Sequence, residues 1–502
     1  MAIYIDAHDV PDVENIRSDV LRFVIREHRR QVARWDKLMA YYMARNDVVT
    51  QNTEGEVKVI ADYPKYITDV ILGFYLGDPV KYDTKEDDNS ITPGAVKATV
   101  KDGAVVRLMP HDMEADIQPV IQAYSNQTIA EIDAKVGKGM GIFGEMYELA
   151  YASDDAVPVP KSAAYDPRVA IMVRDNTVEH HKMFFMTYEK RKRLDGKQYY
   201  AVYIYTDKTE KVYTSDTINL ASASFLQNPE SERPHYFGEV PAVEYQNNAE
   251  RLGDFETVLS LIDAYNNLLS NRVTDKNKFV DSILALYGVS LRDDQVKRLK
   301  TDKMLDEIPE DARIEYIQKV LDESSVQVLA DNLAREIHKQ SMTVDMTDEN
   351  FSGNSSGQAL KLKLLTMNML VKNKIRNLEK GLRKRFEMYN HWLSVQNIMG
   401  IVDKNLVEPV FTISMPINEA EIVSMVKNLQ GIVDDETLIN QLWFVRDAKS
   451  VIEKVREQRE EAQKNYLDTF GITANRSENV GWDEEDEEET EGAEDEEIKK
   501  AR

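Results

Sequence analysis

The chain has 502 residues, of which 42% are hydrophobic and 30% charged, and its formal net charge is −25. This length exceeds what one hydrophobic core usually supports and suggests about three packed units. The composition excludes wholesale disorder, and the negative charge argues against a protein that grips nucleic acid over its whole surface.

Cysteine is absent from the sequence, so neither a disulfide framework nor a thiolate metal site can form. Folding in a reducing compartment, a cytoplasm, is therefore expected. The first six residues lack the basic stretch and apolar run of a secretory signal, and no segment reaches eighteen uncharged apolar residues. We expect a protein that is neither secreted nor membrane-spanning.

The first half of the chain combines helices with a sheet. Apolar residues recur at helical spacing over residues 16–24, before residues 38–47 run into a turn. They recur again over residues 65–75, after which Gly77-Asp78-Pro79 ends the helix and begins an extended stretch. Between residues 146 and 243, β-branched and aromatic runs predict a mostly antiparallel sheet, with strands around 172–173, 183–188, 199–205 and 211–213.

The second half is predicted to be mainly helical. Apolar stripes indicate helices over residues 254–278 and 323–342, which could pack antiparallel with a small strand-and-helix module, residues 279–318, at their far end. The polar, glycine-rich residues 346–357 predict a mobile loop. Residues 358–398 contain no proline and predict a helix about 60 Å long. A short extended run at 410–415 precedes helices at 418–430, 435–441 and 447–465.

Charge is distributed unevenly along the chain. The long helix carries nine lysines and arginines, from Lys361 to Arg385, against only Glu379 and Glu387. Its basic face either pairs with acidic surfaces of its own or neighbouring subunits, or contacts phosphates. In contrast, 12 of the 15 residues from 483 to 497 are acidic. This predicts a disordered tail over residues 477–502, which either solvates the protein or binds a partner.

The motifs that resemble catalytic or binding sites are weak. The glycine-rich residues 137–144 follow a helical pattern and precede a strand, the reverse of a phosphate loop, and predict a helix-to-strand turn. His180 and His181 lie in an extended run whose side chains point to opposite faces, so they cannot share a metal. Residues 353–357 match Gly-x-Ser-x-Gly without the strand that a nucleophile elbow needs. No Gly-Lys-Ser or Gly-Lys-Thr triplet exists, although carboxylate-only chemistry stays open.

Several short motifs occur in a fixed order along the chain. They are Tyr41-Tyr42-Met43 with Asn46-Asp47; Gly77-Asp78-Pro79-Val80; Val240-Pro241 with Asn247-Asn248, Asp254 and residues 261–265; residues 353–357 before Ala359-Leu360; and Glu421-Ile422-Val423 with Asp435-Glu436-Thr437. In type, order and spacing they resemble the portal proteins of tailed double-stranded DNA bacteriophages, in particular long-tailed phages of Gram-positive hosts.

The resemblance implies an α+β fold with a mainly helical stem and crown, a β-containing wing and a small α/β clip. The implied parts are a wing, residues 1–252; a first stem helix, 253–278; a clip, 279–318; a second stem helix, 319–343; a tunnel loop, 344–357; a long helix and return strand to the wing, 358–416; a helical crown, 417–476; and a disordered acidic tail, 477–502.

The implied function is that of a structural ring subunit with no enzyme activity and no cofactor. About twelve copies with cyclic symmetry would form the channel for genome packaging and ejection and a docking site for terminase and head-tail connector proteins. The implied partners are other copies of the chain, double-stranded DNA, terminase, scaffolding and major capsid proteins and head-completion proteins, with no membrane. The implied location is the portal vertex of the virion, and the host cytoplasm during assembly.

The same resemblance assigns candidate site residues. The tunnel-loop residues that would face DNA are Asp348, Glu349, Asn350, Ser352, Asn354, Ser355 and Ser356, and phosphate contact would come from Lys361, Lys363 and Lys372. Net acidity suits a conduit, because each phosphate neutralised by a lysine adds affinity that a packaging motor must break.

Two other functions fit the composition. A helical head adaptor or scaffold would bind other head proteins without forming a conduit. A metal-dependent hydrolase would draw paired carboxylate ligands from the 88 acidic residues. Negative-stain microscopy separates the three hypotheses, since only a portal forms a ring with a central hole, while nuclease activity of the pure protein would favour the hydrolase.

Overall fold

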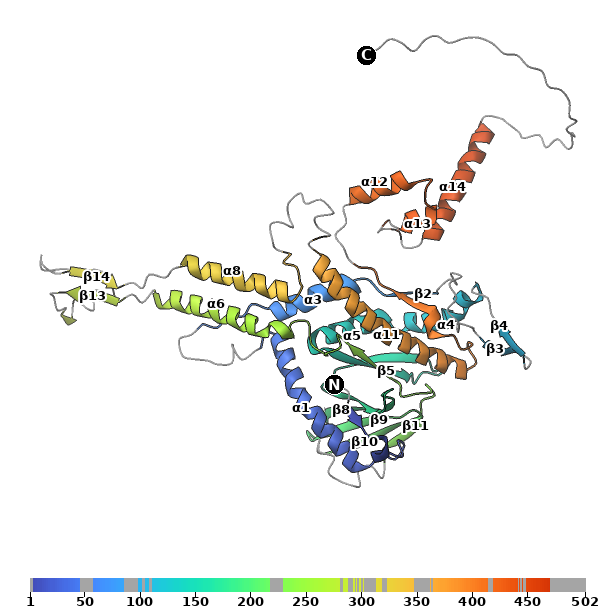
Figure 1. The fold of residues 1–502 in the computed structure, drawn as a ribbon, viewed down its shortest axis with the longest axis horizontal. Helices are drawn as coiled ribbons and strands as arrows, with labels where there is room; N and C mark the ends of the chain where they lie inside the picture. The colour runs from blue at the N-terminus through green and yellow to red at the C-terminus, as the bar shows by residue number, and fades with distance from the viewer. Residues whose placement is uncertain are drawn as a thin grey trace, which may run out of the picture. The chain divides into compact units, whose positions relative to one another are not determined.

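A computed structural model gives the fold of the chain (Figure 1). It describes residues 3–45, 57–84, 98–101, 104–107, 111–216, 229–279, 283–287, 313–317, 323–346, 364–413, 419–440 and 448–469, together with residues 292, 293, 295, 298, 301, 362, 442 and 445. The chain divides into two compact units, Met1–Pro416 and Ile417–Arg502. Among the described residues, helices and sheets both contribute substantially, as the α+β prediction requires.

A six-stranded sheet of the first unit has the order β1-β7-β8-β9-β10-β11. Its strands are β1 (Ile3–Ile5), β7 (Ala170–Asp175), β8 (Lys182–Lys192), β9 (Gln198–Tyr205), β10 (Thr209–Ser215) and β11 (Ser231–Pro234). Only β1 and β7 pair in parallel, and the other described pairs are antiparallel. The mostly antiparallel sheet that the sequence predicts is therefore confirmed.

Both faces of this sheet are covered by other parts of the chain. Successive strand residues point to opposite faces, and neighbouring residues of β8 pack in different cores. Phe184 packs in one core with residues of helix α1 (Ser18–Tyr42), whereas its neighbour Phe185 packs in another core with Tyr147 of a second sheet. Helix α1 then continues past the sheet, and Trp35 and Leu38 near its C-terminal end enter the largest core of the unit. Residues 38–47 were expected to run into a turn, and the helix continues to Tyr42 before the chain turns.

The second sheet has the order β12-β5-β6 and is antiparallel. Its strands are β12 (Ala242–Gln246), β5 (Glu145–Ala152) and β6 (Pro160–Tyr165). Helix α5 (Ile129–Phe143) leads directly into β5.

The glycine-rich segment differs from its prediction as a turn. Gly137, Gly139 and Gly141 lie inside α5, and only Gly144, with a left-handed φ of 85°, forms the turn. The glycines allow close packing: a Cβ atom on Gly141 would stand 2.7 Å from a carboxylate oxygen of Asp254. The segment is therefore a helix face against which other parts of the chain pack closely.

Helix α3 (Tyr63–Leu76) and strand β2 (Lys81–Thr84) confirm the helix-then-strand prediction on either side of Gly77-Asp78-Pro79. Strand β2 pairs antiparallel with β15 (Val407–Val410), which follows the short helix η4 (Lys404–Leu406). The extended run was expected at residues 410–415. The strand instead spans Val407–Val410, and Val410 pairs with Lys81, the first residue of β2. A small hairpin of β3 (Ala98–Lys101) and β4 (Ala104–Arg107) precedes helix α4 (His111–Asn126).

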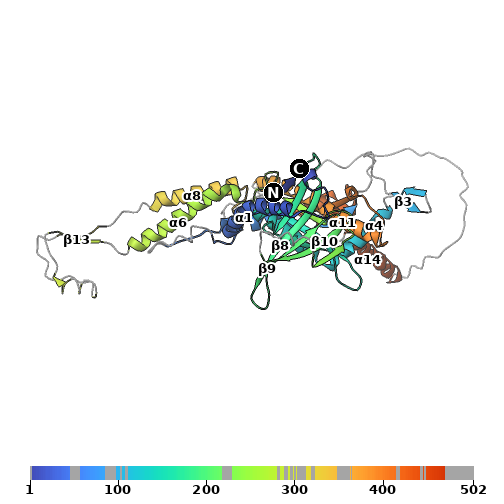
Figure 2. The same cartoon turned by 90° about the horizontal axis from the view of Figure 1, so that it is seen from below.

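The two amphipathic helices expected in the second half are present. They are α6 (Leu259–Phe279), which follows the short helix η3 (Glu256–Val258), and α8 (Glu323–Gln340). The helices lie side by side in both views (Figures 1 and 2). Arg272 in the second half of α6 pairs with Glu323, the first residue of α8, over 2.9 Å, so the two helices run antiparallel. Strands β13 (Ile283–Tyr287) and β14 (Arg313–Ile317), in the segment that connects them, pair antiparallel.

Helix α11 (Leu365–Val395) has 31 residues and a length of about 46 Å. Its apolar stripe is buried in the largest core, as the spacing predicts. The buried members are Leu364 just before the helix, Met367, Val371, Leu378, Leu382, Phe386, Tyr389 and Leu393. The helix was expected to start at residue 358, and residues 358–361 and 363 lie outside the described residues.

The second unit contains helices α12 (Glu419–Leu429), α13 (Asp435–Asn440) and α14 (Ala448–Thr469). They match the helices expected at 418–430, 435–441 and 447–465. The predicted acidic tail, residues 477–502, lies outside the described residues. Throughout the described parts of both units, no helix has the length and apolar character needed to cross a membrane.

Candidate functional site around helix α11

The segment that leaves α8 is held against α3. Met342 has a left-handed backbone, with φ of 57°, and turns the chain out of the helix. The hydroxyl of Tyr66 on α3 donates to the carbonyl oxygen of Val344 over 3.0 Å and accepts from the backbone N–H of Met346 over 3.1 Å. The chain is therefore fixed at residue 346, where the predicted mobile loop begins.

An aromatic cluster supports the same junction. The ring of His338 on α8 lies edge-on to Tyr63 and Tyr66, with centroids 5.6 and 5.7 Å apart. Burial lowers the pKa of His338, which favours the neutral ring in this contact. Helices α3 and α8 are thus joined by uncharged aromatic packing at the point where the loop begins.

The segment that enters α11 is anchored by apolar side chains. Leu364 and Met367 are almost completely buried in the largest core. Leu362, Leu365 and Met369 are exposed on the other side of the same turns. The start of α11 thus has one face in the core and one apolar face that no described residue covers.

Most of the candidate site residues lie between these two anchors and outside the described residues. These are Asp348, Glu349, Asn350, Ser352, Asn354, Ser355, Ser356, Lys361 and Lys363, and the Gly-x-Ser-x-Gly segment at 353–357 lies there too. Lys372 is described: it is an exposed residue of α11.

Lys374, two residues further along α11, is buried and paired. Its ammonium group lies 2.7 and 2.6 Å from the two carboxylate oxygens of Asp254, and both side chains are only 2% exposed. Asp254 also accepts from the amide of Asn247 over 2.9 Å, and its own backbone N–H donates to the carbonyl oxygen of Gly141 over 2.7 Å. This pair connects α11, α5 and the segment before α6.

Arg385 forms a second buried charge cluster. Its guanidinium group contacts Asp133 of α5 over 2.8 Å, Glu148 of β5 over 3.3 Å and the hydroxyl of Tyr82 over 2.8 Å. Burial alone would lower the pKa of Arg385, but the carboxylates of Asp133 and Glu148 outweigh that effect and raise it. Arg385 is therefore a structural cation that joins α11 to the second sheet.

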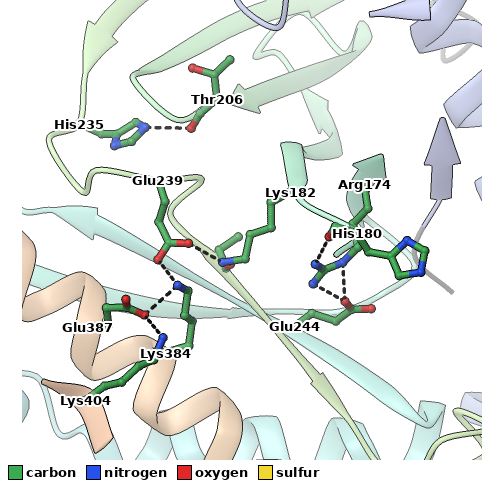
Figure 3. A network of polar contacts seen from close by, with 11 residues as sticks. Arg174, His180, Lys182, Thr206, His235, Glu239, Glu244, Lys384, Glu387 and Lys404 are labelled. Atoms are coloured by element: carbon green, nitrogen blue, oxygen red, sulfur yellow. Dashed lines mark hydrogen bonds and ion pairs between the residues drawn. The ribbon is translucent and has the colours of Figure 1, made fainter. Parts of the chain in front are cut away.

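Lys384 belongs to a chain of alternating charges (Figure 3). Its ammonium group lies 2.8 Å from both Glu239 and Glu387. Glu239 also contacts Lys182 of β8 over 3.2 Å, and Glu387 contacts Lys404 of η4 over 2.8 Å. Burial lowers the pKa of Lys182 to about 8. This series of ion pairs links the six-stranded sheet, α11 and the segment that leads into β15.

The described cations of the basic helix fall into two groups, those paired with carboxylates and those exposed without an ion pair. Lys374, Lys384 and Arg385 pair with carboxylates elsewhere in the chain, and Arg383 pairs with Glu379 on the same helix. Three exposed cations, Lys372, Arg376 and Lys380, form no ion pair with any described residue. Internal pairing therefore accounts for the C-terminal half of the basic segment and leaves one exposed stripe.

A family model for phage portal proteins of the SPP1 Gp6-like type matches residues 21–465 of the chain. The match covers all of the elements around α11. The chain belongs to the phage portal protein family. Portal proteins of this family are structural components of the virion and form oligomeric rings.

Two portal proteins illustrate the similarity. The chain is 24% identical over 328 residues to the portal protein of Bacillus phage SPP1, an alignment that covers 60% of this chain and 62% of the relative. It is 23% identical over 248 residues to the portal protein of Clostridium phage phiCD119, with 48% and 51% covered. The chain thus spans between half and two thirds of the length of these relatives.

The motif that most resembles the portal family has a structural role. Asn248 caps the turn before α6 by donating to and accepting from the backbone of Leu252 over 2.9 and 2.8 Å, and Asp254 binds Lys374. The sequence did not predict this last pair or the contacts of Tyr66, since spacing within one element says nothing about partners more than a hundred residues away. Asp254 stood out in the sequence only as part of the motif that resembles the portal family.

The remaining motifs carry no described site. His180 and His181 lie in the turn between β7 and β8, where His181 contacts the carboxylate of Asp175 over 3.1 Å. Across the described residues, no group of three or more histidine, aspartate or glutamate side chains is arranged to hold a metal ion.

Proposed function

We propose that this portal protein assembles into a ring of about twelve copies around a channel through which double-stranded DNA is packaged and ejected. Membership of the portal family supports the ring. The observation that carries the channel is the pair of fixed ends: the chain is anchored at Met346 by Tyr66 and again at Leu364 by the core. The intervening segment can follow DNA without loosening α8 or α11.

The proposal assigns a part to each region. Residues 1–252 form the wing, residues 253–278 and 319–343 the stem helices, residues 279–318 the clip, and residues 417–476 the crown. Residues 344–357 form the tunnel loop, residues 358–416 return to the wing, and residues 477–502 form an acidic tail. The antiparallel pair α6 and α8 supports the stem assignment, because its outer residues Val328 and Leu329 are exposed apolar side chains suited to contact with another copy.

The proposed partners follow from this arrangement. Terminase and the head-completion proteins dock on the ring, scaffolding and major capsid proteins surround it, and the protein resides at the portal vertex after assembly in the host cytoplasm. The loop residues from Asp348 to Ser356 face the DNA, and Lys361, Lys363 and Lys372 are candidates for phosphate contact. A helical adaptor without a conduit remains the second candidate, although its helices would not need a connection held at both ends.

Tryptophan substitutions test the channel. Changing Asn354 and Ser355 to tryptophan should leave rings intact but block or slow DNA packaging, because the added volume from every copy meets in one small cross-section. The matched control changes Leu194 and Lys197, at the exposed tip between β8 and β9, to tryptophan. The control should package DNA normally. Packaging at the wild-type rate by the Asn354 and Ser355 variant would contradict a channel lined by this loop.

A further inference from the structure

A cavity of 530 Å³ lies beside the exposed stripe of α11. It is lined by residues between 246 and 257, by residues 340–342 at the end of α8 and by one face of α11, and it is open to solvent. Its lining is rich in amide side chains, such as Asn247, Asn373 and Asn377, and includes three cations, Lys374, Arg376 and Lys380. Amides and cations together indicate a site for an anionic partner that also makes hydrogen bonds.

The cations of this cavity are available to a ligand. Arg376 and Lys380 are exposed, lie one turn apart on the same helix face and form no ion pair with any described residue. Lys374 also lines the cavity, but Asp254 already neutralises its charge. The cavity therefore presents two uncompensated positive charges in a protein whose formal net charge is −25.

Asn247 forms a buried part of the cavity wall. This residue is only 5% exposed, and its side-chain nitrogen donates to the carbonyl oxygen of Leu252 and to Asp254 over 2.8 and 2.9 Å. Its side-chain oxygen is buried and accepts no hydrogen bond from any described group. A buried acceptor without a donor is unfavourable by about 1–3 kcal/mol. Because this oxygen is inaccessible, a partner seated in the cavity meets the exposed cations Arg376 and Lys380 and the exposed amide of Asn373 instead.

Apolar side chains distinguish a polypeptide partner from the backbone of DNA. Met342, which lines the cavity, and Leu365 and Met369, which precede its lining residues on α11, are exposed, and such apolar surfaces are typical of sites covered by protein. A phosphodiester backbone could pair with Arg376 and Lys380, but it has no apolar group to cover these side chains. A short acidic segment of protein carries a carboxylate and apolar side chains within the same few residues.

We infer that this cavity receives an acidic segment from a second copy of the chain. A carboxylate of that segment pairs with Arg376 and Lys380, and its neighbouring apolar side chains cover Met342. A second copy is the partner because the strongly acidic chain supplies its own complementary charge and because the proposed ring, on which this inference rests, places copies side by side. Part of the basic stripe on α11 then serves assembly and not DNA.

Cross-linking from the cavity identifies its occupant. Since the sequence contains no cysteine, the Asn373→Cys variant, which keeps both cations of the cavity, carries one thiol that can be labelled with benzophenone maleimide. Rings assembled from equal amounts of ¹⁴N- and ¹⁵N-labelled copies are irradiated, digested and examined by mass spectrometry. We expect mixed-isotope products that contain an acidic peptide. Products confined to a single copy, or rings without any product between copies, would overturn the inference, as would cross-links to DNA alone in filled heads.

Charge reversal measures the contribution of the cavity. The double variant R376E/K380E should need at least tenfold more protein for half-assembly in sedimentation velocity. The control K190E/K192E makes the same charge change at exposed positions at the end of β8 and should assemble like the wild type. Changing the cross-linked carboxylate to lysine should restore rings of R376E/K380E. Unimpaired rings from R376E/K380E would overturn only this inference, whereas a wild-type chain that stays monomeric would refute the proposed ring itself.

Discussion

At the scale of single residues, α11 is held by charges that are buried only because they are paired. Lys374 and Asp254 are each 2% exposed and lie within 2.7 Å of one another. Removing one member of such a pair leaves the other charge buried and uncompensated, which is much less favourable than replacing both. The pair therefore fixes α11 against α5 and the entry to α6.

The Lys374→Met variant should reduce the free energy of unfolding by about 3–5 kcal/mol, because Asp254 then keeps a buried charge without a partner. Urea denaturation followed by circular dichroism measures the change. Lys372→Met is the matched control: Lys372 is exposed two residues away, and its replacement should alter stability by no more than about 0.5 kcal/mol. Equal effects of the two variants would contradict the structural role of the pair.

His28 gives the fold a defined pH dependence. Its Nε2–H donates to the carbonyl oxygen of Pro167 over 2.7 Å, and its Nδ1 lies 2.8 Å from the hydroxyl of Tyr188. Burial lowers the pKa of His28 to about 4 from an ordinary value of 6.5. Between pH 6.5 and pH 4, His28 therefore binds a proton in the unfolded chain but stays neutral in the folded chain. The free energy of unfolding decreases as the pH falls through this range.

The stability difference between the wild type and His28→Gln should consequently shrink by about 3 kcal/mol between pH 7 and pH 4. Thermal or urea unfolding at several pH values measures it. The variant His8→Gln, which alters an exposed residue, should follow the wild-type profile throughout. A constant difference between wild type and His28→Gln at all pH values would show that His28 does not stay neutral in the fold.

At the scale of elements, α5 depends on glycines at its packed face. A Cβ atom on Gly141 would lie 2.7 Å from Asp254 and 3.0 Å from Thr68, whereas a Cβ atom on Gly73 of α3 would meet nothing within 4 Å. Both glycines are inside helices, so alanine improves helix propensity equally at both positions. Only the packing differs between them.

Gly141→Ala should therefore destabilise the protein by about 1–3 kcal/mol through overpacking, while Gly73→Ala should stabilise it by roughly 0.5–1 kcal/mol. Melting temperatures of the two variants test the opposite signs. If both variants gain stability, the close approach of α5 to Asp254 is not present in solution.

At the scale of the whole molecule, the acidic tail and the ring are predicted to be independent. Residues 483–497 offer almost no apolar side chains that could be buried. Truncation after Arg476 should leave the melting temperature and ring formation by light scattering nearly unchanged. A loss of solubility or of rings would show that the tail takes part in assembly.

Strong periodicity in the sequence predicted the main helices. Apolar residues at spacings of three and four indicated helices over residues 65–75, 254–278, 323–342 and 358–398, and the structure has helices at 63–76, 259–279, 323–340 and 365–395. Runs of β-branched and aromatic residues predicted the strands of the sheet. The order of short motifs also pointed to the portal family before any fold was known. Composition gave the acidic character and the basic helix.

How these elements are fixed to each other depends on contacts between residues that are distant in the chain. Glycines 137–141 suggested a turn because their type signals local freedom, but packing against α3 and Asp254 keeps them helical. Likewise, the charge of the basic helix is a local property, whereas its division into buried pairs such as Lys374 with Asp254 and an exposed stripe at Arg376 and Lys380 depends on partners distant in the chain. Long-range pairing leaves no periodic trace in one sequence, because it follows from which surfaces meet and not from the spacing within either one.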